Sequence, residues 1–335
     1  MGIGGIRMKK FSVFDSTSAL DVKRKKEITK WIVSVIRIIV LLAIGYVILY
    51  PLLHMLITSI RSRESFMNAS RVWIPNSFAV KDNYKIALEL LDYNKSILAT
   101  FKYQIVSALL EVVTCSIAAY GFARFKFKFK GALIVWLFLT ILIPDIMVIM
   151  PRVVNFSRLD FLGILGLFNK ITGIDLRPNV FNTGFAFWLP SLFGVGLRSG
   201  ILIYIYIQFF KGLPAELEEA AWVDGAGPVK TFLSIAVPSS GVVILTVTVF
   251  SLIWHYNDYL LSSMYLSADY PLAVYLNMML ERLPAFGYLA LSPKEPETMA
   301  FLMAGCTLFV TPMLIVYMVL QRWFIESIDR VGITG

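Results

Sequence analysis

The sequence predicts an all-α, polytopic membrane protein with six transmembrane helices and a short helical segment on the cytoplasmic side. Of its 335 residues, 58% are hydrophobic and 16% are charged, whereas soluble domains are about half apolar and a quarter charged. Apolar runs of about 20 residues recur, each long enough to cross roughly 30 Å of hydrocarbon. Such runs must be helical, because lipid offers no partner to backbone N–H and C=O groups. The net charge of +9 is clustered beside these runs, which indicates membrane topology and lipid contact and excludes nucleic acid as a partner.

Residues 1–30 are expected to form a polar cytoplasmic tail with a basic cluster at 23–26. The apolar run that follows, 31–59, is too long for the core of a cleavable signal peptide and is predicted to be the first span. Its length favours a tilt, or a kink near Pro51.

The other predicted spans are 97–122, 132–151, 183–209, 237–262 and 298–320. The short loop at 123–131 carries four basic residues and no acid, namely Arg124, Lys126, Lys128 and Lys130. Lysine and arginine in short loops mark the cytoplasmic side. The predicted division is therefore a cytoplasmic tail at 1–30, a membrane domain at 31–320 and a cytoplasmic C-terminal tail at 321–335.

Residues 210–236 interrupt the apolar pattern and are predicted to form a helix, a turn and a second helix on the cytoplasmic side. Pro214 fits a first helical turn, and the acids that follow suit the positive end of the helix dipole. Gly225, directly after Asp224, suits a left-handed C-cap. Pro228 can open the second helix, whose apolar side chains are expected to share one face; these are Val229, Phe232, Leu233 and Ala236.

Three interpretations compete for this segment. A solvated loop would not need two ordered helices with apolar faces. Helices that lie on lipid are usually lysine-rich, whereas this segment has four acids against Lys211 and Lys230. A groove in a partner protein fits better, because Ala220 and Ala221 permit close approach and Trp222 can serve as an anchor.

The segment resembles the EAA loop of binding-protein-dependent ABC importer permeases. The motif residues are Glu219-Ala220-Ala221, Gly225, Ile235 and Val237-Pro238, with valine in place of the usual leucine. Further stretches follow the order expected of the maltose-type (carbohydrate) permease subfamily: NYKIAL at 83–88, AAYGFARFKFKFKG at 118–131, WHYNDYL at 254–260 and LQRWFIES at 320–327. The resemblance covers residues 31–327 and implies a permease fold of the type I ABC importers.

The resemblance implies that the EAA loop, 213–238, contains a coupling helix that docks onto a cytoplasmic ABC ATPase dimer. The implied coupling residues are Glu218, Glu219, Ala220, Ala221, Asp224, Gly225 and Pro238. A second permease subunit in a heterodimer, an extracytoplasmic solute-binding protein, a carbohydrate substrate moved by alternating access, and a place in the plasma membrane are implied as well. The chain lacks a G-x-x-x-x-G-K-[ST] phosphate loop. ATP would therefore bind to the partner, and the chain is expected to be a transporter subunit without catalytic residues or a cofactor.

Charged residues inside apolar spans are costly and therefore mark functional candidates; the candidates for the substrate path are Glu111, Asp145, Arg198 and Asp258. Arg198 is interpreted either as a partner of Glu111 or Asp145 inside the bundle or as a substrate contact. Asp145 and Asp258 lie near the ends of predicted spans, where solvation is the alternative to a role in the substrate path.

An aromatic and polar run that includes Trp254 and Asn257 offers flat faces and hydrogen-bonding groups to a sugar, or else belongs to an interfacial aromatic belt. His54 and His255 are expected to be hydrogen-bonded polar groups, because two histidines alone cannot make a metal site. Cys115 and Cys306 are interpreted as packing residues.

Two other classes of function compete with the importer permease. An ion-coupled secondary transporter usually carries internal repeats with broken helices, and no repeat is visible. A membrane enzyme needs a converging set of catalytic side chains, and none is visible. An ABC importer permease for a solute other than a sugar, such as glycerol phosphate, remains an open alternative.

Overall fold

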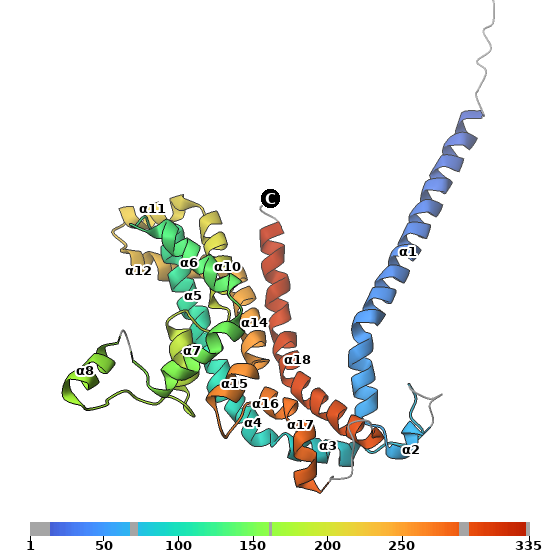
Figure 1. The fold of residues 1–335 in the computed structure, drawn as a ribbon. Helices are drawn as coiled ribbons and strands as arrows, with labels where there is room; N and C mark the ends of the chain where they lie inside the picture. Colours follow the sequence, from blue (N-terminus) through green and yellow to red (C-terminus); the bar gives the residue numbers. More distant parts are fainter. Residues whose placement is uncertain (1–13, 68–72, 161–162, 288–294, 333–335) are drawn as a thin grey trace, which may run out of the picture. The chain divides into compact units, whose positions relative to one another are not determined.

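The computed structural model describes residues 14–67, 73–160, 163–287 and 295–332, and this part of the chain is mostly helical (Figure 1). Its β pairing amounts to an isolated bridge between Arg61 and Phe78. The all-α prediction is confirmed. The chain divides into two units, residues 1–57 and residues 58–335.

The first unit consists, in its described part, of most of one long helix, α1 (Phe14–Ser59). The helix begins well before the apolar run at 31–59, so the basic cluster of the predicted tail is helical too. Pro51 lies inside the helix. No side chain of residues 26–57 is buried, which leaves the apolar surface of α1 for lipid or for other helices.

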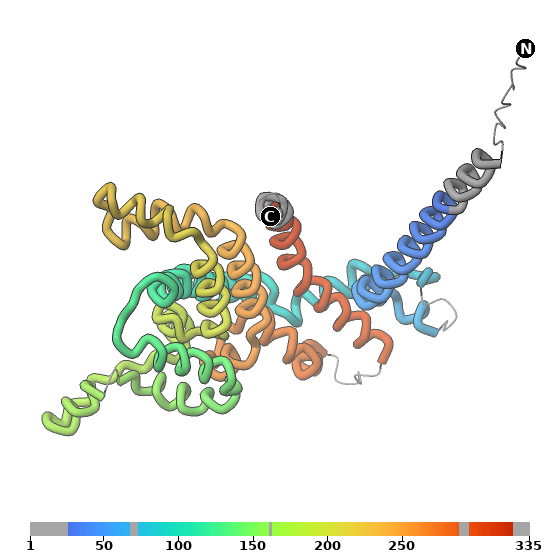
Figure 2. The backbone as a smooth tube through the Cα atoms, turned by 90° about the horizontal axis from the view of Figure 1, so that it is seen from above, coloured from blue at the N-terminus to red at the C-terminus, as the bar shows by residue number. Residues whose placement is uncertain are grey.

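The second unit is built around a rod of 32 residues, Tyr93–Arg124. The rod consists of α4 (Tyr93–Thr100), the π turn η1 (Phe101–Ile105) and α5 (Val106–Arg124). Three helices pack against α5 (Figures 1 and 2): α9 (Phe185–Leu192), α10 (Ser199–Gly212) and α14 (Gly241–Tyr256). Cys115 and Ala119 on α5 are fully buried in a core with Leu202, Tyr206 and Val247. Small side chains on α5 thus allow its neighbours to approach closely, as in other membrane bundles.

A second hydrophobic cluster forms around Leu90, Leu91 and Met279. The Asn83 side chain donates hydrogen bonds to the carbonyl oxygens of Ser59 and Arg61, both at 2.9 Å. The helices that pack around the cluster are α3 (Val80–Leu90), α16 (Leu272–Asn277), α17 (Met279–Arg282) and α18 (Pro296–Gly332). Short neighbouring elements are α2 (Arg63–Phe66), α15 (Leu260–Tyr265) and the 3-10 turn η3 (Leu283–Phe286).

The predicted count of six spans is not confirmed in the described part of the chain. Three helices are long and apolar enough to cross a bilayer: Lys26–Ser59, Tyr93–Arg124 and Pro296–Trp323. The number rises to five if two bent helix pairs each count as one span. The pairs are α6 (Lys130–Leu142) with α7 (Asp145–Ser157), bent by 101°, and Pro228–Ser239 with α14, bent by 82°.

Three predicted spans are interrupted: the span at 237–262 breaks at Ser240 and again after Tyr256, and the other two have a local cause. The span at 132–151 bends at Pro144, because proline disfavours the helical conformation of the residue before it. The span at 183–209 is divided into α9 and α10, and α10 alone, with 14 residues, is only about 21 Å long. The break between them contains Gly194 and Arg198, both with positive φ.

The loop between α7 and α9 carries a helix of its own, α8 (Ile164–Thr172). Two backbone hydrogen bonds close the base of the loop, from Leu159 N to Pro178 O at 2.9 Å and from Val180 N to Phe156 O at 3.0 Å.

Candidate functional site

The segment predicted to dock onto a partner has the expected helix, turn and helix. It consists of α11 (Ala215–Val223), a turn, and α12 (Pro228–Thr231), which continues through the π turn η2 (Phe232–Ala236) into α13 (Val237–Ser239). In Figure 1, α11 and α12 lie together at one end of α5 and α10.

Gly225 ends α11 in the left-handed conformation that the sequence predicts. Its φ is +78°, and a Cβ built there would meet nothing within 4 Å. The amide of Gly225 donates to Trp222 O at 3.0 Å and the amide of Ala226 donates to Ala221 O at 2.9 Å, which is the Schellman pattern. Glycine is therefore required by the backbone conformation and not by lack of space.

An ion pair inside the second unit ties α11 to α5. The Nε of Arg124, at the end of α5, donates to the Glu218 carboxylate at 2.9 Å, and its Nη2 donates to Leu213 O at 2.8 Å. Both side chains are largely buried, and Glu218 is only 3% exposed. Glu218 therefore faces this chain, although the motif places it among the coupling residues. This pairing could not be predicted from the sequence, because Arg124 lies in the basic loop and the two residues are 94 positions apart.

The opposite side of α11 is exposed, and it includes apolar side chains. Glu219, Ala220 and Asp224 are exposed, and Ala221 is half-buried. Trp222 is 44% exposed and Val223 is 88% exposed. Exposed aromatic and aliphatic side chains beside acids are typical of a docking surface.

The predicted common face of the second helix is wrong. Phe232 and Ala236 are buried, whereas Val229 and Leu233 are exposed. The π turn widens the helix at this point, so the α-helical spacing does not apply. Phe232 packs on Tyr120, with ring centroids 4.9 Å apart. Pro238 lies in α13 and is exposed.

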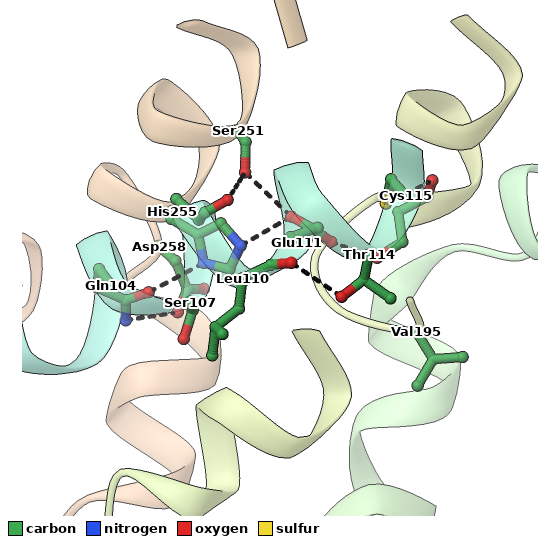
Figure 3. A network of polar contacts seen from close by, with 12 residues as sticks. Gln104, Ser107, Leu110, Glu111, Thr114, Cys115, Val195, Ser251, His255 and Asp258 are labelled. Carbon is green, nitrogen blue, oxygen red and sulfur yellow. Dashed lines mark hydrogen bonds and ion pairs between the residues drawn. The ribbon is translucent and has the colours of Figure 1, made fainter. Parts of the chain in front are cut away.

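Beneath this end of the bundle, a buried polar network centres on Glu111 (Figure 3). Glu111 on α5 is 0% exposed. Its carboxylate lies 2.9 Å from His255 Nε2 and 3.1 Å from Ser251 Oγ, and it also accepts a hydrogen bond from the Ser199 hydroxyl. The network thus joins α5, α10 and α14 through one carboxylate.

The network extends along the bundle through Gln104 in η1. His255 Nδ1 lies 3.3 Å from Gln104 Oε1, and Gln104 Nε2 donates to Ser262 Oγ at 2.5 Å and to Asp258 Oδ2 at 3.4 Å. Asp258 also accepts hydrogen bonds from the backbone amides of Leu261 and Ser262. His255 is hydrogen-bonded as expected. Asp258, only 9% exposed, is a buried cap of α15, so the solvated interpretation of this residue is wrong.

The predicted pairing of Arg198 with Glu111 or Asp145 is also wrong. The Arg198 guanidinium lies over the Trp254 ring, with its Cζ 5.1 Å from the centroid. No carboxylate of the described residues lies within 4.0 Å of it. Asn257 is exposed and donates to Ile253 O at 2.8 Å, and therefore terminates α14.

Two cavities adjoin the network. The larger, about 300 Å³, has a mainly apolar rim and a polar set of Thr140, Asp145, Arg152, Arg198 and Ser199. The smaller, about 20 Å³, has room for about one water molecule. Its polar lining consists of Gln104, Arg152, Ser191, His255, Asp258 and Tyr265. Arg152 and Gly196 line both cavities. The described residues contain no cluster of three or more His, Cys, Asp or Glu side chains that could hold a metal ion.

Comparison with known proteins gives consistent results. The profile of the family described as "Binding-protein-dependent transport system inner membrane component" matches residues 111–330. A probable starch degradation products transport system permease of Thermoanaerobacterium thermosulfurigenes is 26% identical, over 91% of this chain and 97% of the relative. An sn-glycerol-3-phosphate transport system permease of Pectobacterium atrosepticum is 24% identical, over 86% and 94%.

A solved structure of a bacterial ABC transporter involved in the import of the acidic polysaccharide alginate has a chain of the same fold. Its TM-score is 0.64 at 19% identity, covering 88% of this chain and 98% of that one. At this level of identity the match describes the fold alone.

Proposed function

Given that the chain belongs to the family of binding-protein-dependent transport system inner membrane components, we propose that it forms the translocation path of an ATP-driven carbohydrate importer. The family is that of the multi-pass inner-membrane permeases of ABC importers, which work with an ATPase and a solute-binding protein. Relatives named for starch degradation products and for alpha-glucoside transport support carbohydrate as the substrate. A relative named for sn-glycerol-3-phosphate keeps a phosphorylated polyol as the alternative.

The observation that carries the proposal is the solvent-exposed surface of α11. The opposite side of this helix is held to α5 by the ion pair between Glu218 and Arg124. We assign contact with the ATPase to Glu219, Ala220, Ala221 and Asp224, and we assign Gly225 to the turn that ends the contact helix. Glu218 instead fastens α11 to α5 through Arg124.

This attachment suits a rigid lever. A partner that moves α11 also moves Arg124 at the end of α5, and Phe232 presses on Tyr120 of the same helix. Since α5 carries Glu111, the movement would reach the polar network and its adjoining cavities. Such coupling requires two discrete arrangements of the bundle that the partner's states stabilise differently.

We further propose that the termini and the 213–238 segment face the cytoplasm, with 1–30 and 321–335 as cytoplasmic tails. The basic loop at 123–131 supports this orientation. A second permease subunit would complete the path as a heterodimer. Pro238 would redirect the chain from the coupling segment into α14.

The test is co-purification of the nucleotide-binding subunit with this chain, expressed together with the other importer subunits. Glu219→Lys is expected to abolish recovery of the ATPase and ATP-dependent uptake without lowering thermal stability, because Glu219 is exposed. Glu89→Lys is the matched control, since Glu89 is an exposed acid on α3. Full recovery and uptake with Glu219→Lys would overturn the assignment. Uptake by the purified chain alone, driven by a proton or sodium gradient, would favour a secondary transporter.

A further inference from the structure

We infer that the cavity of about 300 Å³ binds the negatively charged group of an acidic saccharide, so that the transported carbohydrate is an anion. The inference rests on the proposed function and specifies its class of substrate. Arg198 and Arg152 are assigned to the anionic group.

The charges of the cavity lining favour an anion. Two guanidinium groups, Arg152 and Arg198, face one carboxylate, Asp145. Within the described part of the chain, neither arginine has a carboxylate within 4.0 Å. Asp145 likewise has no cationic group within 4.0 Å among the described residues. Asp145 and Arg152 lie seven residues apart on α7 without forming an ion pair. The lining of this cavity therefore carries one more cation than anion, and Asp258, which lines the smaller cavity beside Arg152, is already hydrogen-bonded to Ser262. Arg198 is exposed and Arg152 is half-buried, so an anionic ligand can reach both guanidinium groups.

Each guanidinium keeps free donors after its contacts within the protein are counted. Arg152 makes a long hydrogen bond from Nη2 to Val195 O, at 3.4 Å, and interacts with the Tyr265 hydroxyl. The Cζ of Arg198 lies 5.1 Å from the centroid of the Trp254 ring. A guanidinium has five N–H donors in a fixed fork, which matches the geometry of a carboxylate or a phosphate. A neutral sugar would leave this charge unpaired.

The backbone around Arg198 is held in an unusual conformation. Arg198 has a φ of +58°, a region that non-glycine residues rarely adopt because of steric cost. Two residues earlier, a Cβ at Gly196 would lie 2.7 Å from Glu111 Oε1 and 2.9 Å from Ser191 Oγ. Glycine thus lets the loop rest on the buried network. Strained residues of this kind concentrate at ligand sites, where the surrounding structure over-determines them.

Hydroxyl groups beside the cavity suit the rest of a saccharide. Ser191 Oγ is buried and has no hydrogen-bond partner. It lines the smaller cavity, which shares Arg152 with the larger one and is also lined by Tyr265. Buried polar atoms normally have a partner. A water molecule or a sugar hydroxyl would satisfy Ser191 Oγ. Trp136 adds a flat apolar side chain to the larger cavity.

The test compares one oligosaccharide in charged and neutral forms. The complex of both permease subunits and the ATPase is placed in phosphatidylcholine nanodiscs, which lack anionic lipid, and the solute-binding protein is left out. Calorimetry measures binding of a uronic-acid trisaccharide and of its methyl ester. We expect the acid to bind about 10- to 100-fold more tightly, the factor that a hydrogen bond to a charged group provides. Equal affinity of the two forms, or no binding of the acid, would overturn the inference without any variant.

Variants locate the site. Arg198→Gln is expected to weaken binding of the acid by the same factor and to leave the ester unchanged, while Arg198→Lys retains part of the preference. Arg177→Gln is the control, because Arg177 lies in the loop between α7 and α9 and pairs with Asp175. An unchanged preference in Arg198→Gln would overturn the assignment of this residue.

Uptake separates this inference from the proposed function. The full importer, with its binding protein, is reconstituted in proteoliposomes with ATP inside. ATP-dependent uptake of a neutral gluco-oligosaccharide as efficient as that of the acid would overturn the anionic substrate but support a carbohydrate importer. Absence of ATP-dependent uptake for every saccharide would overturn both, whereas uptake of glycerol 3-phosphate alone would keep the anion and reject the saccharide.

Discussion

Replacing Glu111 with alanine is expected to lower the thermal stability of the membrane domain substantially. Glu111 is fully buried and accepts hydrogen bonds from three side chains. Ser251 Oγ retains a second acceptor, Ala108 O at 3.2 Å, so two donors, Ser199 and His255, lose their partner. A buried donor left unsatisfied costs about 1–3 kcal/mol, which gives a loss of roughly 2–6 kcal/mol for the two.

The measurement is thermal unfolding of the purified complex in one defined lipid, followed by intrinsic fluorescence. At about 2 °C per kcal/mol for a large domain, the Tm of Glu111→Ala should fall by roughly 4–12 °C. Glu111→Gln keeps one carbonyl acceptor and should fall by about half as much. Glu89→Ala, which removes an exposed carboxylate, should leave the Tm unchanged. A Tm for Glu111→Ala within about 1 °C of the wild type would refute the view that this carboxylate holds three helices together.

Further predictions concern the coupling segment and the loop between α7 and α9. Gly225→Val should cost about 1–2 kcal/mol in the left-handed conformation and reduce recovery of the ATPase. Gly225→Asn should retain most of the ATPase recovery. Equal recovery for the two variants would contradict a requirement for positive φ at this position. Arg124→Met leaves the Glu218 carboxylate buried without a partner and should lose about 3–5 kcal/mol in thermal unfolding, and a second change, Glu218→Leu, should recover most of the loss; no recovery would mean that the pair does more than compensate charge. Hydrogen bonds from the Arg177 side chain and backbone amide hold the pKa of Asp175 below its ordinary value. The pair therefore contributes stability above that ordinary value and loses it as pH falls through the lower folded value. Carboxyl NMR should show this lowered pKa and its return toward the ordinary value in Arg177→Gln, and identical titrations would refute the pairing.

Hydropathy was sufficient to predict the helices but not where they change direction. The first and last predicted spans are continuous helices, because a long apolar run in lipid has no other way to satisfy its backbone. The third predicted span bends because Pro144 ends one helix and begins another. A window average registers only apolarity and therefore does not register this local signal. The break before α10 is stabilised by the buried network beneath it, which no local pattern contains.

The candidate site was predictable where the chemistry is local. Gly225 could be assigned to a left-handed cap because it lies between the end of an acidic helix and a proline that begins the next helix. Glu111 could be singled out as a charge in an apolar run, but its partner could not, since His255 is 144 residues away. Arg198 is the cation in an apolar span that the sequence offers as a partner for Glu111, yet its guanidinium lies over the Trp254 ring. Choosing between two cations requires the direction of each helix face, and that emerges only from packing.

The two π turns carry a consequence for how this chain can vary. Each holds one more residue than an α turn, so the helix beyond it is rotated by about 100° relative to an uninterrupted one. The turn at Phe101–Ile105 thereby sets the azimuth of Glu111, and the turn at Phe232–Ala236 separates the surface of α11 from α14. Deleting a single residue in either π turn would rotate the helix that follows about its axis and move its buried face away from its packing partners. These ten positions should therefore tolerate exchanges of side chain far better than any change in length.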